Sequence, residues 1–405
     1  MRINQARLWD SLMEMAKLGA TDKGGSSRLA LSDEDKAGRL LFIEWCEALG
    51  MEISRDAIGN LFATYAGINR QSPPIVMGSH LDTQPKGGRF DGIYGVLAAL
   101  EVVRTLHDHD LKLNHDIEIA VWMNEEGARF SPAMLGSEVF IGELALEKGL
   151  ASRDRAGVSV EEALALVQEA GERPFARTLN SYFELHIEQG PILEDYNKEI
   201  GVVTGGQAIA WLDVEISGRS QHAGTTPMRY RKDAMLGTSD FLLRLEDYIA
   251  QIPDALLTIG EIKIPHSSRN TIAGTVNFTL DIRHPDTEKV KVMVAEAKAL
   301  GSKTASDRDL EIGMQDVWLS PAIPFDKTCI ELVQSAVHEL GFSHIEMISG
   351  AGHDAIHLAK HCPTTMIFIA CKDGISHNEA ESITEQDAGN GTNVLLHAIL
   401  KRDQI

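Results

Sequence analysis

The sequence predicts an α/β protein: a mixed β-sheet with helices on both faces, interrupted by a smaller inserted α+β domain. Up to about residue 210, short apolar runs alternate with amphipathic stretches, which is typical of a sheet covered by helices. Between 211 and 322 the pattern changes to the order βαββαβ of a ferredoxin-like domain. From 323 the first pattern resumes. We therefore expect a discontinuous larger domain, 1–210 and 323–405, around an inserted domain at 211–322.

The first segment contains a helix with a clear end and several short strands. The amphipathic stretch from Asp33 to Leu49 stops at Gly50, and glycine is common just after a helix. Its other predicted elements are a helix over Val96–His107, further helices before Ala170, and strands at Asn60–Tyr65, Pro74–Met77, Ile117–Met123 and Ser181–Leu185. Polar residues follow these strands, at the edge where α/β sheets gather reactive groups.

The inserted domain has its own set of elements. We predict four strands there, at Trp211–Ser217, Leu256–Ile264, Thr275–Ile282 and Leu310–Trp318. Two helices are predicted between them, over Asp233–Ile249 and Thr287–Leu300. The C-terminal segment then predicts helices over Lys327–Leu340 and Asp354–His361 and a strand over Thr365–Cys371. This last strand returns the chain to the sheet of the larger domain.

The charge balance excludes several classes of function. The 405 residues include 38 Lys and Arg against 59 Asp and Glu, a formal net charge of −21. Nucleic-acid binding needs a concentrated basic surface, and an anionic membrane repels an acidic protein, so neither partner is expected. The four cysteines are scattered without a Cys-x-x-Cys pair, which argues against disulfide and thiolate–zinc frameworks. Because no stretch is typical of a secretory signal or a membrane span, we expect a cytoplasmic protein.

Five candidate metal ligands lie at the ends of predicted strands or just after them: His80, Asp91, Glu126, His186 and His377. Each one alone is more often an ordinary loop residue. Together, three imidazoles and two carboxylates at one edge of a sheet form the nitrogen and oxygen set that zinc and similar divalent ions prefer. The pattern therefore predicts a metal centre.

The number of candidate ligands indicates two metal ions. A single catalytic zinc normally has three protein ligands, so five suit two ions that share one carboxylate. Asp91 is the expected bridge, because it lies between Phe90 and Gly92 in a glycine-rich loop that permits close approach. Two ions can hold a water molecule between them, lower its pKa and polarise the carbonyl group that it attacks.

Two further carboxylates stand beside these ligands. Asp82, two residues after His80, is expected to accept the second N–H of that imidazole and so fix its tautomer. An aspartate there is also a common turn residue. Glu125, next to Glu126, is expected to take a proton from water and pass it to the leaving nitrogen. Two adjacent glutamates at a strand end are otherwise more often a solvated pair.

The segments that contain these residues resemble the N-carbamoyl-L-amino-acid hydrolase and allantoate amidohydrolase group. This group is part of the zinc-dependent aminoacylase and peptidase family with a dimerisation domain. The resemblance extends from about Gly24 to near the C-terminus, and its segments are GSHLDTQPKGGRFDG, NEEGARF, ELHIEQG, GRSQHAGTTPMRYRKDA, RNTIAGTVNFTLDIRHPD, SGAGHDA and GISHNEAE. They are long, occur in the family's order and are specific to it.

The resemblance implies that the larger domain is catalytic and contains a dinuclear metal centre. In the family's arrangement, Asp91 bridges two divalent ions, Glu126 and His377 complete one ligand set, and His80 and His186 complete the other. Zinc is the expected metal, although manganese, cobalt and nickel also suit such ligands.

The resemblance also indicates the base and the substrate class. Glu125 matches the general base of the group. Many peptidases of the wider family have an acidic residue at the ligand position that His186 occupies here, whereas the carbamoyl-amide hydrolases have histidine. A ureido substrate is therefore expected rather than a dipeptide.

In this family the inserted domain pairs with its copy in a homodimer and contacts the substrate. His222 matches a histidine that enters the partner's active site and stabilises the developing oxyanion. Arg283 and Asn270 match groups that hold the substrate carboxylate, for which a guanidinium is well suited. The other matching positions are Gln207, Gly352 and His353, of which His353 also suits a structural role.

We therefore expect a metal-dependent amidohydrolase that cleaves the carbamoyl group of N-carbamoyl-L-amino acids to give the amino acid, CO2 and NH3. Allantoate, ureidoglycolate and N-carbamoyl-β-alanine, the β-ureidopropionase substrate, are the alternatives within the group. A binding or scaffolding protein that has lost turnover is the alternative outside it. The presence of Glu125 argues against that alternative, because a protein without turnover has no need of a base.

Overall fold

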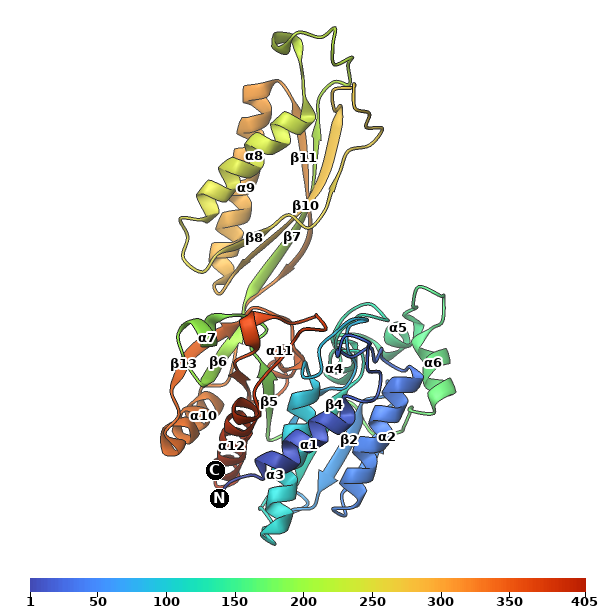
Figure 1. Ribbon diagram of the computed structural model, residues 1–405, viewed down its shortest axis with the longest axis vertical. Helices are drawn as coiled ribbons and strands as arrows, with labels where there is room; N and C mark the ends of the chain where they lie inside the picture. Colours follow the sequence, from blue (N-terminus) through green and yellow to red (C-terminus); the bar gives the residue numbers. More distant parts are fainter. The chain divides into compact units, whose positions relative to one another are not determined.

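A computed structural model describes residues 1–405 (Figure 1). The chain divides into two compact units. The larger unit contains Met1–Gly205 and Pro324–Ile405, and the inserted unit contains Gly206–Ile323. Each unit has its own hydrophobic core.

A nine-stranded mixed sheet forms the centre of the larger unit, in the order β1-β2-β4-β3-β5-β14-β6-β12, with β13 paired to β6. Its strands are β1 (Glu52–Arg55), β2 (Leu61–Tyr65), β3 (Ile75–His80), β4 (Ile117–Trp122), β5 (Ser181–Ile187), β6 (Ile200–Gly206), β12 (Ile323–Pro324), β13 (His344–Ser349) and β14 (Thr364–Ile369). The four neighbours β4, β3, β5 and β14 run parallel, whereas β1 pairs antiparallel with β2, β2 with β4, and β6 with β14. The carboxyl ends of the four parallel strands therefore meet at one edge.

Helices cover both faces of this sheet (Figure 1). One face packs against α1 (Gln5–Met15), α2 (Asp33–Glu47), α3 (Ile93–Asp108), α10 (Lys327–Leu340) and α12 (Glu385–Arg402). The other packs against α4 (Leu135–Phe140), α7 (Ile192–Asp195) and α11 (Asp354–Leu358). Beside them, α5 (Leu146–Ala151) and α6 (Val160–Val167) enclose a smaller apolar cluster. All four parallel strands are buried along their whole length, which explains their nearly continuous apolar sequences.

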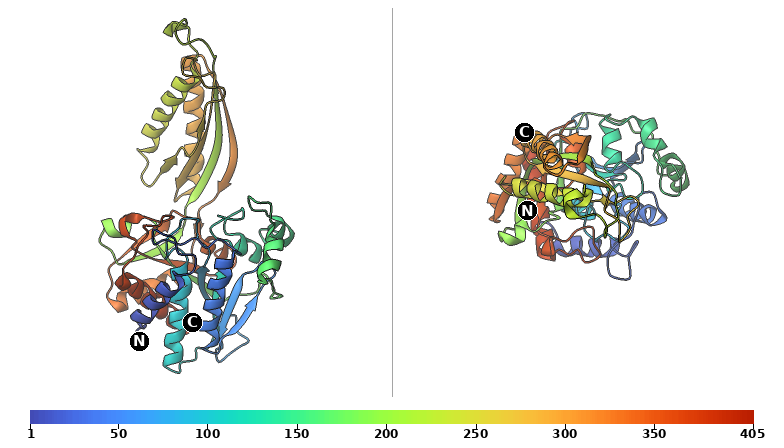
Figure 2. Two further views of the ribbon diagram at one scale, coloured as in Figure 1. Left: turned by 45° about the vertical axis from the view of Figure 1, so that its right-hand side comes forward. Right: turned by 90° about the horizontal axis from the view of Figure 1, so that it is seen from above.

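The inserted unit is an antiparallel sheet in the order β11-β7-β10-β8, with β9 paired to β10. Its elements are β7 (Ala208–Ser217), α8 (Ala234–Ile249), β8 (Leu256–Thr258), β9 (Ile262–Lys263), β10 (Thr275–His284), α9 (Thr287–Arg308) and β11 (Glu311–Ser320). Both helices lie on the same face of the sheet (Figure 2). Buried residues alternate with more exposed ones along β7 and β10, as expected for a sheet with one covered face.

The predicted fold class is confirmed, and the differences concern the weaker elements. The single strand predicted over Leu256–Ile264 is wrong: β8 and β9 are separate short strands. Four strands, β1, β6, β12 and β13, were not predicted. Two of them, β1 and β13, are partly exposed and mixed in composition, so they lack the apolar signal of the central strands.

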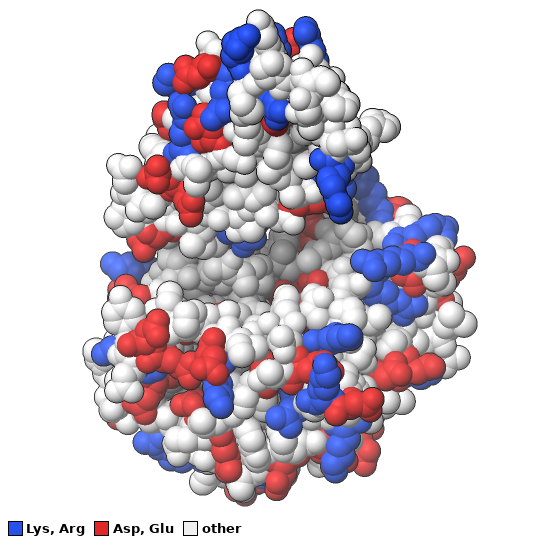
Figure 3. Space-filling model, turned by 45° about the horizontal axis from the view of Figure 1, so that its top comes forward, with Lys and Arg blue, Asp and Glu red and all other residues white.

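The surface carries charges of both signs. On the face shown in Figure 3, acidic and basic side chains are interspersed, without a continuous basic surface. No helix combines the length and the apolar composition that crossing a bilayer requires.

Candidate metal centre and active site

The carboxyl edge of the parallel strands brings the candidate ligands together. His80 is the last residue of β3, Glu126 follows β4, and His186 is the penultimate residue of β5. His377 follows β14 in a loop, with a left-handed backbone (φ 53°). Asp91 lies just before Gly92, which caps the N-terminus of α3, where the helix dipole favours a negative charge.

Asp91 lies at the centre of this group. Its Oδ1 is 3.2 Å from Nε2 of His186 and 3.8 Å from Nε2 of His80. Its Oδ2 is 3.5 Å from Nε2 of His377, which in turn is 3.3 Å from Oε2 of Glu126. The two carboxylate oxygens therefore face two different sets of ligand atoms.

The residues present fit two divalent ions. Three groups have ligand atoms within 4.8 Å of one another. Two of them, His80–Asp91–His186 and Asp91–Glu126–His377, share Asp91, and the third is Glu184–His186–His353. Ligands at about 2.0–2.2 Å from a tetrahedral zinc stand roughly 3.3–3.6 Å apart, close to the separations around Asp91. The arrangement provides two sets of three protein ligands with Asp91 in both.

Backbone carbonyls orient the two buried imidazoles. Nδ1 of His80 is 2.9 Å from the carbonyl oxygen of Asp82, and Nδ1 of His186 is 2.9 Å from that of Ile187. A carbonyl can only accept, so Nδ1 carries the hydrogen in both rings and Nε2 faces the carboxylates. The sequence-based expectation named the carboxylate of Asp82 as the partner of His80, but its Oδ1 is 4.0 Å from Nδ1. The turn after β3 points the carbonyl at the ring instead.

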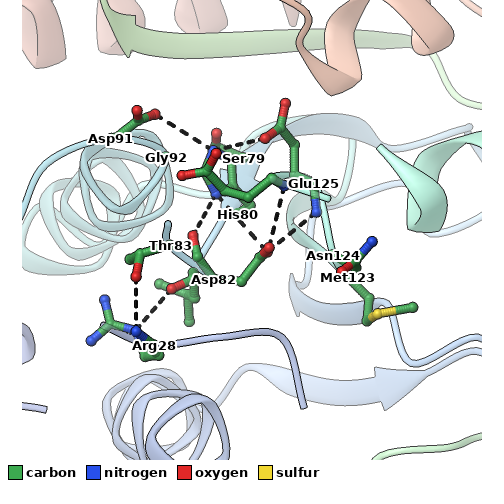
Figure 4. Close-up of polar contacts among 12 residues, drawn as sticks. Arg28, Ser79, His80, Asp82, Thr83, Asp91, Gly92, Met123, Asn124 and Glu125 are labelled. Carbon is green, nitrogen blue, oxygen red and sulfur yellow. Dashed lines mark hydrogen bonds and ion pairs between the residues drawn. The ribbon is translucent and has the colours of Figure 1, made fainter. Parts of the chain in front are cut away.

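The carboxylate of Asp82 binds the backbone of the two glutamates that follow β4. One oxygen accepts a hydrogen bond from the backbone N–H of Glu125 at 3.3 Å (Figure 4), and the other accepts one from the backbone N–H of Glu126, also at 3.3 Å. Asp82 is 3% exposed, and this burial raises the pKa of its carboxyl to about 7. The residue thus links the turn that orients His80 to the pair of glutamates.

The two glutamates have distinct environments. The carboxylate of Glu126 accepts hydrogen bonds from the backbone N–H and the side-chain amide of Gln84, at 3.1 and 2.8 Å. That of Glu125 faces Nε2 of His80 at 3.4 Å. Burial, with the nearby carboxylates of Asp354 and Glu126, raises the pKa of Glu125 well above its usual value. A buried carboxyl with a raised pKa and few fixed partners is suited to accept and release a proton.

Three residues that sequence reasoning missed surround Asp91. Its Oδ2 accepts hydrogen bonds from the Gln189 amide at 2.9 Å and the Ser376 hydroxyl at 2.8 Å. Oε1 of the buried Glu381 accepts from the backbone N–H groups of Phe90 and Asp91. All three lie inside the quoted segments ELHIEQG and GISHNEAE, so the segments contained the signal although no single residue did.

The larger unit also contains two of the candidate substrate contacts. The ring of His353 packs edge-on against that of His186, with centroids 4.5 Å apart, and its Nε2 is buried without a protein partner. Gly352 is exposed beside Met134, whose side chain would lie 3.1 Å from a Cβ at that position.

The inserted unit separates the other candidate contacts into two groups. Gln207 and Arg283 lie at the end of the β7–β10 pair where Ala208 faces His284. His222 and Asn270 lie in loops beyond the opposite end, where the backbone N–H of Ala223 donates to the carbonyl of Asn270. Since β7 and β10 each contain ten residues, the two ends are about 30 Å apart.

His222 has a defined tautomer. Its Nδ1 accepts hydrogen bonds from the backbone N–H groups of Gly224 and Thr225, at 3.1 and 3.2 Å. In the neutral ring the hydrogen then resides on Nε2. The exposed edge of His222 is therefore a hydrogen-bond donor.

The fold and the grouped ligands define an α/β protein with a candidate metal site at the carboxyl edge of its sheet, and comparisons with known proteins identify the family. Residues 76–401 match the model of peptidase family M20/M25/M40. An N-carbamoyl-L-amino-acid amidohydrolase from Rhizobium meliloti is 44% identical over 406 residues, covering 100% of this chain and 98% of the relative. An allantoate amidohydrolase from Bacillus subtilis (strain 168) is 30% identical, covering 97% and 96%. The crystal structure of a hydantoinase/carbamoylase family amidase from Burkholderia ambifaria is 50% identical, with a TM-score of 0.96 and coverage of 99% and 98%.

The chain belongs to peptidase family M20/M25/M40. Within that family it is similar, over nearly its whole length, to proteins named N-carbamoyl-L-amino-acid amidohydrolase and allantoate amidohydrolase. The resemblance inferred from the sequence segments is confirmed.

Proposed function

We propose that this protein is a metal-dependent amidohydrolase that cleaves the carbamoyl group of N-carbamoyl-L-amino acids, giving the amino acid, CO2 and NH3. The main support is the position of Asp91, whose two oxygens face separate ligand sets beside the buried Glu125. The names of the relatives support the class, a hydrolase of carbon–nitrogen bonds other than peptide bonds, and the 44% relative supports the substrate.

Two divalent ions, with zinc the expected metal, would be held by His80 and His186 on one side and by Glu126 and His377 on the other, with Asp91 between them. Bound there, the ions would activate water and polarise the carbamoyl carbonyl. Manganese, cobalt and nickel suit the same nitrogen and oxygen ligands.

The protein's own residues would move the proton and stabilise charge. Glu125 takes a proton from the attacking water and delivers it to the leaving nitrogen. His222 donates a hydrogen bond from its Nε2–H to the oxyanion that develops on the carbamoyl oxygen. Such a donor stabilises the transition state by roughly 3–4 kcal/mol. Arg283 receives the substrate carboxylate, which it can bind through two parallel hydrogen bonds.

The separation within the inserted unit supports a homodimer. His222 and Asn270 are about 30 Å from Arg283 along β7 and β10, too far to contact one small ureido acid together. A second copy that supplies His222 and Asn270 would complete the site. We therefore propose that the inserted unit pairs with its copy; the cytoplasmic location stays a prediction.

The test is ammonia release after loading with zinc, manganese, cobalt or nickel. We expect the highest kcat/KM for an N-carbamoyl-L-amino acid such as N-carbamoyl-L-methionine, with its D-enantiomer as control. Allantoate, ureidoglycolate and N-carbamoyl-β-alanine are the comparison substrates. A higher kcat/KM for one of these would replace the proposed substrate, and no hydrolysis of any of them with any metal would favour a binding protein.

A further inference from the structure

Arg28 is a fully buried cation close to the metal centre, and it lies outside the residues 76–401 that match the family model. Its side chain is 0% exposed, and no carboxylate oxygen lies within ion-pair distance of it. Burying an arginine without a carboxylate partner is expensive, and an apolar side chain of similar size would fill the space at lower cost. A packing role alone therefore does not explain an arginine here.

The partners of Arg28 are backbone carbonyls from two separate segments. Nε donates to the carbonyl of Leu81 at 2.8 Å, in the turn directly after β3. Nη1 donates to the carbonyls of Met15 and Leu18, at 3.2 and 2.6 Å, at the C-terminal end of α1. Carbonyls at a helix C-terminus lack intrahelical partners and attract positive charge. The guanidinium thus ties the end of α1 to the end of β3.

The backbone of Arg28 also forms hydrogen bonds with the turn after β3. Its N–H donates to Oγ1 of Thr83 at 2.8 Å, and its carbonyl accepts from the N–H of Thr83 at 2.8 Å (Figure 4). Gly38 of α2 makes room for the side chain, because a Cβ there would lie 3.2 Å from Cδ of Arg28. Leu81 and Thr83 are therefore both fixed, and Asp82 lies between them.

The turn that Arg28 holds contacts three residues of the site. Asp82 faces Nδ1 of His80 with its carbonyl and holds the N–H groups of Glu125 and Glu126 with its carboxylate. Gln84 donates to the carboxylate of Glu126 through its backbone and its side chain. A shift of this turn would move a ligand imidazole, a ligand carboxylate and the candidate base at the same time.

We propose that Arg28 is a positioning residue of the metal centre: it fixes the turn from Leu81 to Gln84 in the geometry in which that turn orients His80, Glu125 and Glu126. The inference rests on the proposed metal-dependent function. Arg28 itself contacts neither metal ligand nor base, so its effect is transmitted through the turn.

The experiment compares Arg28→Lys, Arg28→Met and Thr83→Val with two control variants. Lysine keeps the charge but cannot span the carbonyls of both segments. Thr83→Val keeps the size of the side chain and removes two hydrogen bonds, the one that the hydroxyl accepts from the Arg28 N–H and the one that it donates to the carbonyl of Gln84. The controls are Arg104→Met and Thr105→Val, a partly buried arginine and a buried threonine of α3 whose hydrogen bonds lie within and between helices.

Zinc affinity is measured on the full chain by chelator competition, and unfolding of the metal-free protein is measured in urea. Residues that support metal ligands from outside typically affect affinity by about 10–100-fold, so we expect the Arg28 and Thr83 variants to lose zinc affinity in this range. Their kcat should fall more than their KM rises, because substrate-binding groups are untouched. Thr83→Ser should restore affinity, and the controls should keep the parental value.

Other outcomes would overturn the role of Arg28 or the proposed function separately. Folded variants whose zinc affinity stays within threefold of the parent would overturn the proposal, and if the Arg28 variants do not fold, Thr83→Val decides alone. Parental protein that binds zinc but hydrolyses no ureido acid would overturn the proposed function and leave this affinity test intact. Hydrolysis by the parent together with unaffected variants would overturn the role of Arg28 alone.

Discussion

Asp281 holds one edge of the Arg283 guanidinium in a two-point ion pair. The distances are 2.8 Å from Nε to Oδ1 and 2.7 Å from Nη2 to Oδ2, between side chains on the same face of β10. The indole N–H of Trp211 donates to Oδ2 of Asp281 at 3.0 Å and completes the arrangement. The plane of the guanidinium, the proposed carboxylate anchor, is therefore set by an aspartate two residues earlier.

This arrangement predicts that Arg283→Lys raises KM. A lysine is a point charge and cannot form the planar two-point contact with a carboxylate. A hydrogen bond to a charged group contributes about 1.5–3 kcal/mol, so KM should increase by roughly 10–100-fold with a smaller change in kcat. Steady-state kinetics with an N-carbamoyl-L-amino acid measure this. An unchanged KM would remove Arg283 from the substrate site, and Asp281→Asn should cause a smaller increase.

Glu125→Gln should keep the metal ions and lose turnover. The substitution preserves size but removes the group that accepts the proton, and such groups contribute about 100–10,000-fold to rates. Metal content by mass spectrometry and ammonia release by coupled assay give the two readouts. Activity within threefold of the parent would show that Glu125 is not the base.

Zinc uptake by the metal-free protein should release protons. Burial lowers the pKa of His186, but the hydrogen bond and charge of Asp91 outweigh it and raise the pKa to about 9. At pH 7 the ring therefore carries a proton that it must lose before Nε2 can bind a metal, so affinity should rise as the pH increases towards 9. The pKa of His80 is lowered to about 4, chiefly by burial, so this ring contributes no proton.

Calorimetry in buffers of different ionisation enthalpy measures this release. We expect at least about one proton per chain at pH 7. Heats that are independent of the buffer would contradict the prediction.

Gly92→Ala should weaken both folding and metal binding. Gly92 has φ 72°, and a Cβ there would lie 2.2 Å from the ring of His80. Gly142 is the matched control, since it has φ 83° and a Cβ there would meet nothing within 4 Å. Gly142→Ala should cost only the left-handed backbone penalty, about 1–2 kcal/mol, with zinc affinity unchanged. Urea unfolding and chelator competition compare the two, and equal effects on zinc affinity would contradict the steric argument.

Subunit mixing tests whether His222 acts across a dimer. His222→Ala and Glu125→Gln chains should each be inactive alone. After mixing and exchange, about a quarter of the parental activity should return, because half of the dimers are hybrids with one intact site each. Verified hybrids without activity would place His222 in the site of its own chain or outside catalysis.

The grouping of the ligands could be predicted from the sequence for a physical reason. His80, Glu126 and His186 each follow or end a continuous apolar run, and parallel strands deliver such positions to one edge. The edge strands β1 and β13 were not predicted, because partial exposure leaves them without a clear apolar pattern.

The contacts that turns make could not be predicted from the sequence. Whether the carbonyl or the carboxylate of Asp82 faces His80 depends on the backbone angles of a turn that lacks periodicity. The burial of Arg28 could not be predicted either, because a single arginine in a polar segment is usually solvated. The distance of His222 from Arg283 required the sheet register, which fixes them at opposite ends of the same two strands.

The carbonyl partners of His80 and His186 affect the electrostatic balance of the centre. A carboxylate partner would have added a negative charge behind each ring, whereas a peptide carbonyl orients the ring and adds none. The ligand set therefore contributes only the charges of Asp91 and Glu126, fewer than two divalent ions would bring. Two bound ions would therefore outweigh the charge of their own ligands, which favours an anionic ureido acid at this point of an otherwise acidic protein.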